Sequence, residues 1–212
     1  MWRKIVIAVP TLIFAFGVLF ASIFRTAAVK YDFKQASKFL PEEVKVLGEK
    51  SVEIDYYLAY PGKVLPDSPF WPVKAVRDRV WLLVTTNPTR SAELALLFAD
   101  KRLGSAKILF EKGKPEIAYS TLTKAEKYLE QAAEAESQNR EKEIDTSEFL
   151  QRLTKASLKH VEVMEYLLTI APEDARPGII QTEDYAKRVY NDARNGLLEK
   201  GITPYENPFE WK

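Results

Sequence analysis

The sequence contains no cysteine and only one histidine, His160. The absence of cysteine excludes disulfides, thiol catalysis and cysteine-ligated zinc sites together. No glutamate stands three residues before His160, so the helical Glu-x-x-His pattern of iron ligands is absent as well. We therefore interpret His160 as a surface or half-buried structural residue rather than a catalytic or metal-binding one. The sequence predicts no catalytic residue, no cofactor and no metal ion.

An excess of charge of either sign is also missing, because 31 lysines and arginines stand against 30 aspartates and glutamates. Nucleic-acid-binding domains carry a strongly basic field, which this balance does not provide. A glycine-rich phosphate loop is missing too, since Gly104 and Gly113 are isolated. We predict no nucleic-acid partner.

Glutamates alternate with lysines between residues 111 and 143. Paired carboxylates could serve glycoside hydrolysis. Interleaving with lysine at helical spacing is, however, typical of a helix face that lies in water. We interpret this run as a solvated helix face.

One long apolar run, Ile5 to Phe24, contains no charged residue. A helix that spans a bilayer needs about 20 predominantly apolar residues, and this run meets that length. The alternative is a cleaved signal peptide with Thr26-Ala27-Ala28 as its cleavage site. Signal peptides have shorter apolar regions, and Arg25 interrupts the approach to that site. We predict that residues 1–28 are a retained single-pass membrane anchor.

The charges beside this run bear on its orientation, because the end richer in lysine and arginine stays in the cytoplasm. Arg3 and Lys4 precede the run, whereas Lys30, Lys34 and Lys38 follow it, which argues against a short cytoplasmic tail. An apolar run that starts at residue 5 is nevertheless typical of an uncleaved export signal. We expect the remainder of the chain to lie outside the cytoplasm.

Apolar residues alternate with other residues at period two from Val52 to Tyr60. This period predicts an extended segment with one buried face, although no partner strand is evident. Because an isolated strand is unstable, we expect residues 29–68 to form a linker and an extended strap that lies along helices. The strap should turn at Tyr60-Pro61-Gly62, and a short helix is expected near Pro41.

The first helix of the main domain should begin between Pro69 and Pro72, because proline fits the first turn of a helix. It should end before Asn87-Pro88, where a second helix starts. Apolar residues recur along it at helical spacing and should mark its buried face. These residues are Val73, Val76, Val80 and Leu83.

The clearest helical pattern is a pair of series in which alanine alternates with a large residue at spacings of three and four. Folding the chain back at Lys112-Gly113-Lys114-Pro115 sets every large residue opposite an alanine, which allows close packing. The series are Ala92, Leu96, Ala99, Leu103, Ala106 and Phe110, then Ala118, Leu122, Ala125, Leu129 and Ala132. We predict a tight antiparallel hairpin within a three-helix unit, residues 69–136.

A polar segment from Ser137 to Asp145 is the best candidate for a long connection. Asp145 or Thr146 can cap the helix that follows, and Glu148 could complete a capping box. A last helix is expected from about Thr182, with Gly201 as its C-terminal cap and an aromatic tail beyond. Residues 146–212 should thus form a helical pair and tail packed on the same core.

A signature runs through the middle of the chain: Tyr60-Pro61-Gly62, Leu65-Pro66-Asp67-Ser68-Pro69, a basic amphipathic helix, Asn87-Pro88, Ala92-Glu93-Leu94 and Arg102-Leu103. From about Tyr57 to Ala135 this signature resembles an uncharacterised bacterial domain family found in membrane-anchored or exported proteins. Trp71-Pro72 departs from the family pattern, in which a residue other than proline follows the aromatic one. The resemblance implies an α-helical domain and transfers no catalytic position.

These patterns predict an all-α protein with an N-terminal transmembrane helix, an extended strap and an antiparallel helical bundle. We expect a non-catalytic interaction or scaffold module of the bacterial cell envelope, anchored in the membrane by Ile5 to Phe24, whose partner is a protein or an envelope component. The candidate binding surface consists of Tyr57, Tyr60, Trp71 and Trp81, although such aromatics also form cores. The alternatives are an envelope hydrolase with an unrecognised site, which a cluster of buried acids would favour, and a secreted helical protein that binds a small ligand, which a large apolar cavity would favour.

Overall fold

The computed structural model describes residues 52–209 and 211. This part of the chain contains five helices and no strand, which confirms the predicted all-α class for it. The helices are α2 (Trp71–Val84), α3 (Pro88–Glu111), α4 (Pro115–Glu141), α5 (Ser147–Ile170) and α6 (Arg176–Glu199). The predicted anchor Ile5 to Phe24 and the short helix near Pro41 lie outside the described residues. None of the five helices has the length and apolar character needed to cross a membrane.

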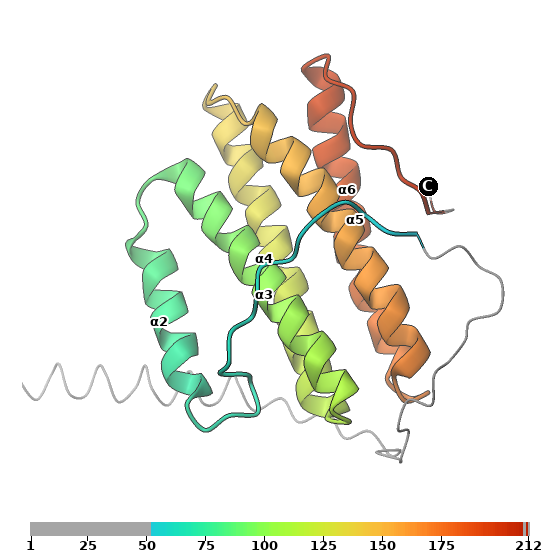
Figure 1. The fold of residues 1–212 in the computed structure, drawn as a ribbon. Coiled ribbons are helices and arrows are strands. Elements are labelled where there is room, and N and C mark those ends of the chain that lie inside the picture. The colour runs from blue at the N-terminus through green and yellow to red at the C-terminus, as the bar shows by residue number, and fades with distance from the viewer. Residues whose placement is uncertain (1–51, 210, 212) are drawn as a thin grey trace, which may run out of the picture. The chain divides into compact units, whose positions relative to one another are not determined.

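Four of these helices form a bundle of two antiparallel hairpins. α3 packs along α4, α5 packs along α6, and the two pairs meet through contacts of α4 with α6 and of α3 with α5. Figure 1 shows the hairpins side by side, with α3 and α5 running in the same direction. α2 lies outside this bundle and, among the described helices, contacts only α3 (Figure 1).

The predicted hairpin is the α3–α4 pair. Every member of the two alanine-alternating series is buried, and Phe110 at the end of α3 is the most exposed of them at 6 %. The turn is made by Gly113, whose φ of +67° lies in the left-handed region that favours glycine. Its N–H donates to Phe110 O, and Lys114 N–H donates to Leu109 O, both at 2.9 Å, which is the Schellman pattern of a helix end.

Two helix ends differ from the prediction. α4 continues to Glu141, so the expected long connection from Ser137 is reduced to residues 142–146. The polar composition concealed the helix there because Glu136 and Asn139 are buried polar residues of its last turns. The connection ends the helix with Glu143 at a φ of 60°, a conformation that a side chain disfavours.

α6 begins at Arg176, well before the expected start near Thr182. Pro177 fits the first turn, where its missing N–H costs nothing. Gly178 lies against Tyr119 of α4, since a Cβ at this glycine would stand 2.6 Å from the Tyr119 hydroxyl oxygen. Pro177 and Gly178, residue types that are common in loops, therefore lie in the first turn of α6, where Gly178 allows a close approach to α4.

Residues 52–65, the described part of the predicted strap, form neither helix nor strand and cross the bundle from α5 to α3 (Figure 1). Residues 29–51 of the predicted linker and strap lie outside the described residues. Ile54 is buried, whereas its neighbours Glu53 and Asp55 are exposed, as period two requires. Side chains of α5 replace the missing strand: Glu162 Oε2 accepts from Ile54 N–H at 2.7 Å, and Lys159 Nζ donates to Ile54 O at 3.4 Å.

The C-terminal tail packs on its own bundle, as the sequence analysis favoured. Tyr190 of α6 donates its hydroxyl to Tyr205 O at 2.9 Å, and its ring meets Trp211 edge to face at 5.4 Å. Trp211 and Phe209 also border the small cluster that Ile54 forms with Leu158 and Tyr190. Strap and tail therefore cover the same part of the α5–α6 hairpin.

Candidate interaction surface

α2 exposes the residues that were expected to be buried. Val73 and Val80 are open to solvent, and Leu83 is 83 % exposed. The only buried residue of the helix is Asp78, which accepts a hydrogen bond from Arg77 Nε at 3.0 Å. The prediction that the apolar residues face the core is therefore wrong: their helical spacing holds, but the face they form points outward.

Aromatic and cationic side chains attach the opposite face of α2 to the domain. Trp81 meets Phe98 of α3 edge to face at 6.4 Å, and Arg102 of α3 lies 5.4 Å from the centre of the Trp71 ring. Lys74 donates its ammonium group to the carbonyl oxygens of Pro61 and Val64 at 2.6 and 3.0 Å. Burial lowers the pKa of Lys74. These contacts hold α2 on the domain, and none of them involves a valine side chain of the helix.

We define the α2 stripe as the outward apolar face of this helix. At 3.6 residues per turn its members fall within an arc about 100° wide. They are Val73, Val76, Val80, Leu83 and Val84. Arg77 and Arg79, both exposed, flank the arc on either side, and the one acidic residue of α2, Asp78, is buried.

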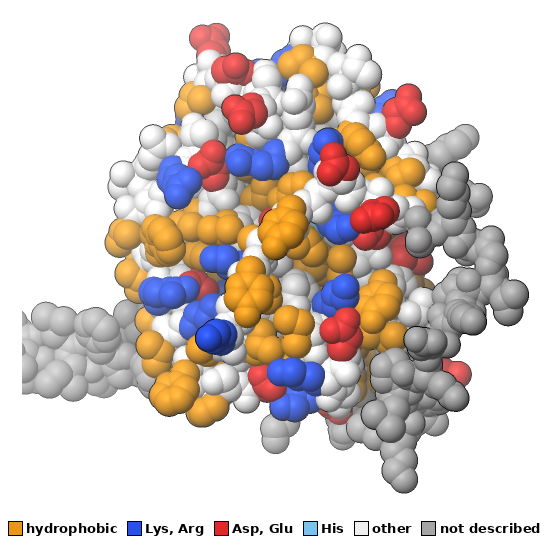
Figure 2. All heavy atoms as spheres, viewed as in Figure 1, with side chains coloured by type: hydrophobic (Ala, Val, Ile, Leu, Met, Phe, Trp, Pro, Cys, Tyr) orange, Lys and Arg blue, Asp and Glu red, His pale blue; other side chains and the backbone are white. Residues whose placement is uncertain are grey.

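The space-filling view shows hydrophobic side chains gathered with lysines and arginines over the side of the molecule where α2 lies (Figure 2). Scattered apolar residues are normal on a protein surface, but a contiguous apolar face marks a site of contact with a protein or a membrane. The α2 stripe is therefore the strongest candidate interaction surface of the described residues. Its spacing was visible in the sequence, whereas its direction was not.

The four predicted surface aromatics lie on two different segments. Tyr57 and Tyr60 project from the strap, and Tyr57 is 90 % exposed. Trp71 and Trp81 belong to α2, where Trp71 is half-buried beneath Lys74 and Arg102 and Trp81 is exposed in part beside Phe98. A binding role for these four residues stays a prediction.

His160 is fully buried, so the expectation of a surface or half-buried residue is wrong. Its Nδ1 lies 2.7 Å from Glu126 Oε1 of α4, and its Nε2 lies 3.3 Å from Asp100 Oδ1 of α3. The other oxygen of Asp100 accepts from the Tyr56 hydroxyl of the strap at 2.8 Å. This network joins the strap, α3, α4 and α5.

The electrostatics of the network favour a charged histidine. Burial by itself lowers the pKa of His160, but Glu126 and Asp100 together raise that pKa to about 9. The imidazolium then donates an N–H to each carboxylate. Burial and the charge of Asp100 also raise the pKa of Tyr56. Glu126 Oε2 is buried without a hydrogen-bond partner.

This network is enclosed. The side chains of His160 and Glu126 are both 0 % exposed, so a substrate cannot reach them without opening the bundle. We interpret this network as a structural polar core, which lends no support to the hydrolase alternative. Glu126, like Glu136, also shows that the glutamate run is not wholly a solvated face.

A groove of about 530 Å³ lies between α4 and α6. Its charged lining residues come from both helices, and ion pairs join Arg188 to Glu130 at 3.8 Å and Arg140 to Glu199. Within residues 52–209 and 211 no group of histidine and carboxylate side chains is suited to hold a metal ion. Two of the ion pairs of the domain thus join the two walls of the groove.

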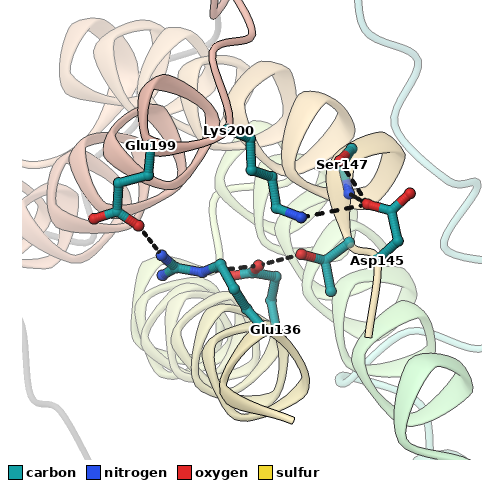
Figure 3. Close-up of polar contacts among 7 residues, drawn as sticks. Glu136, Asp145, Ser147, Glu199 and Lys200 are labelled. Carbon is teal, nitrogen blue, oxygen red and sulfur yellow. Dashed lines mark hydrogen bonds and ion pairs between the residues drawn. The ribbon is translucent and has the colours of Figure 1, made fainter. Parts of the chain in front are cut away.

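Polar contacts close the end of the bundle next to this groove (Figure 3). Glu136 of α4 accepts from the Thr146 hydroxyl at 2.6 Å, and Lys200 reaches Asp145 at 3.3 Å. Asp145 accepts from both the N–H and the hydroxyl of Ser147, and these bonds, with Lys200, lower its pKa to about 2. The N-cap of α5 is Thr146, whose side chain makes no cap bond, and Asp145 just before it accepts from the first N–H of the helix, so the expected box with Glu148 is not formed.

The described residues thus define a helical-bundle domain with one outward apolar helix and an enclosed polar core. Residues 63–174, just over half of the chain, match the domain of unknown function DUF5667, and the chain belongs to this family. The match runs from the strap through α5, across the division that was predicted between residues 136 and 146. No curated protein and no solved structure matches the chain.

Proposed function

We propose that this protein is a non-catalytic interaction module of the bacterial cell envelope, held at the membrane by Ile5 to Phe24. The observation that carries the proposal is the α2 stripe, an apolar face that points away from the bundle on a helix fixed by its other side. Leaving apolar surface in water costs roughly 25 cal/mol per Å², so a partner that covers the stripe gains that free energy.

The competing functions find less support in the described residues. A hydrolase needs titratable groups within reach of a substrate, and the histidine–carboxylate network is closed. A small-ligand protein needs a largely apolar cavity, whereas the groove between α4 and α6 has a charged lining crossed by ion pairs. An exposed apolar helix fits an interaction module better than either.

Photo-crosslinking in cells tests the proposal. A benzoylphenylalanine at Leu83 of the full chain should form adducts with a protein or a lipid after irradiation. The same residue at Ile180, an exposed apolar position on α6 at 51 % exposure, is the control and should form none. Equal yields at the two positions, or no adduct at Leu83, would refute an interaction through α2.

The membrane anchor and its orientation need a separate test. The full chain should stay in the membrane fraction after alkaline carbonate extraction, because a spanning helix resists this treatment. Protease added to intact spheroplasts should degrade the domain after residue 28. Protection of the domain from that protease would place it in the cytoplasm and contradict the proposed orientation.

A further inference from the structure

We infer that the partner of the α2 stripe is the surface of an anionic lipid bilayer. This inference rests on the proposed function and names the class of partner that its surface takes. It commits to lipid because the shape, the charge and the proposed tether each favour a bilayer over a protein partner.

The shape of the surface is that of a ridge. α2 stands outside the four-helix bundle and touches only α3 among the described helices (Figure 1), so its outward face is convex and no neighbouring helix walls it in. Protein interfaces concentrate their energy in anchors that fill pockets. A convex apolar helix instead suits the boundary between headgroups and acyl chains, where such helices bury one face to a depth of about 5 to 10 Å.

The charge around the stripe complements an anionic surface. Arg77 and Arg79 are exposed on its two flanks. Arg77 is paired with Asp78, so Arg79 is the flanking cation whose guanidinium group can reach lipid phosphates while the valines enter the bilayer. The only acid of the helix, Asp78, is buried and paired with Arg77, so it presents no negative charge to the headgroups. Phe70, which is 69 % exposed just before the first residue of the helix, is an apolar residue suited to the same boundary.

The proposed anchor provides proximity. Tethering to a membrane turns contact between α2 and the same membrane into an intramolecular event, so that even weak intrinsic affinity gives high occupancy. α2 would then dock the domain against the bilayer and fix which side of the bundle faces the aqueous space.

A fluorescent probe in the reconstituted full chain tests this inference. Because the chain lacks cysteine, Leu83→Cys gives a single site for an environment-sensitive nitrobenzoxadiazole dye, and the Leu83 side chain contributes little to folding at 83 % exposure. Leu198→Cys on α6, an exposed leucine away from the stripe at 48 % exposure, is the control. Each labelled protein is reconstituted into vesicles of phosphatidylcholine and phosphatidylglycerol that contain headgroup-proximal doxyl lipids, and quenching is measured.

We expect the dye at residue 83 to be blue-shifted and quenched several-fold more than the dye at residue 198. Replacement of phosphatidylglycerol by phosphatidylcholine, raised salt, or the added substitution Arg79→Glu should each reduce this quenching. Val73→Cys, a second site on the stripe, should behave like Leu83→Cys and guards against an effect peculiar to one label.

Equal quenching at residues 83 and 198 would overturn the inference, as would quenching at residue 83 that ignores lipid charge, salt and Arg79. A blue shift that depends on protein concentration without lipid quenching would instead assign the stripe to a second copy of the chain. A protein adduct at residue 83 in cells, combined with no lipid quenching, overturns the bilayer as partner and leaves the proposed function intact. Absence of every adduct removes the proposed function itself.

Discussion

Replacing Glu126 by glutamine should lower the pKa of His160 and reduce the dependence of the protein's stability on pH. The charge of Glu126 is the largest of the influences that raise the pKa of His160, ahead of those from Asp100. Glutamine keeps the size of the side chain and removes that charge. The buried imidazole then meets one carboxylate, while burial continues to favour its neutral form.

The size of the effect follows from the shift itself. The pKa of His160 is about 9 in the folded protein against 6.5 for an unperturbed histidine, which corresponds to stability on the order of 3 kcal/mol. Because the folded pKa is the higher one, this stability is fully present below pH 6.5. This stability declines as the pH rises above 6.5, where His160 of the unfolded chain loses its proton, and it is lost once the pH passes about 9.

Two measurements check this prediction. His160 is the only histidine, so NMR titration of its ring protons reports a single pKa without assignment. Urea unfolding at a series of pH values should show a fall in unfolding free energy between about pH 6.5 and 9, and a smaller fall in Glu126→Gln. Glu130→Gln, one turn along α4 on an exposed pair with Arg188, is the control and should leave His160 unchanged. An imidazole that titrates near 6.5, or a titration indifferent to Glu126, would refute the reasoning.

Three further substitutions test the packing of the bundle, each by urea unfolding. Glu143→Gly should raise the unfolding free energy by about 0.5 to 1 kcal/mol, because residue 143 has a φ of 60° that glycine adopts without strain; an unchanged midpoint would argue against that conformation. Gly178→Ala should destabilise by about 1 to 3 kcal/mol, because its Cβ would stand 2.6 Å from the Tyr119 hydroxyl, and Tyr119→Phe in the same background should restore part of the loss. Ala99→Leu should cost about 1 to 3 kcal/mol by overpacking a position that is 0 % exposed, and a neutral result would show that the α3–α4 seam lies elsewhere.

The hairpin and the strap could be predicted because their information is local. In α3 and α4 the alternation of alanine with large residues specifies both the face and its partner, since a small residue must meet a large one for the helices to approach closely. In the strap, period two separates Ile54 from its exposed neighbours. Each of these patterns therefore specifies which side chains are buried.

The direction of α2 could not be predicted by the same means. Helical spacing shows that Val73, Val80 and Leu83 share a face, but it does not say whether that face meets the core or the surroundings. The assumption that apolar residues point inward failed because Trp71 and Trp81 attach the helix from its other side. The burial of Asp78 beside the exposed Arg77 also could not be predicted from the sequence.

The polar core was missed because its members are far apart in the chain. Glu126 is 34 residues from His160 and Asp100 is 60, so no short motif connects them. A weaker signal was present: His160 lies at helical spacing with Leu153, Met164 and Leu167, all buried on α5. A lone histidine within an apolar face predicts burial, and burial of a histidine requires partners for its nitrogens.

The outward direction of the α2 stripe is the claim on which both proposals depend, and the neighbours Leu82 and Leu83 test it most directly. Leu82 packs against the core, whereas Leu83 is 83 % exposed. Urea unfolding of the full chain in a non-ionic detergent should show that Leu83→Ser changes the unfolding free energy by less than about 0.5 kcal/mol, while Leu82→Ser lowers it by about 1 to 3 kcal/mol. A large loss of unfolding free energy for Leu83→Ser, together with no change for Leu82→Ser, would show that the α2 stripe faces the core. That result would contradict the outward direction.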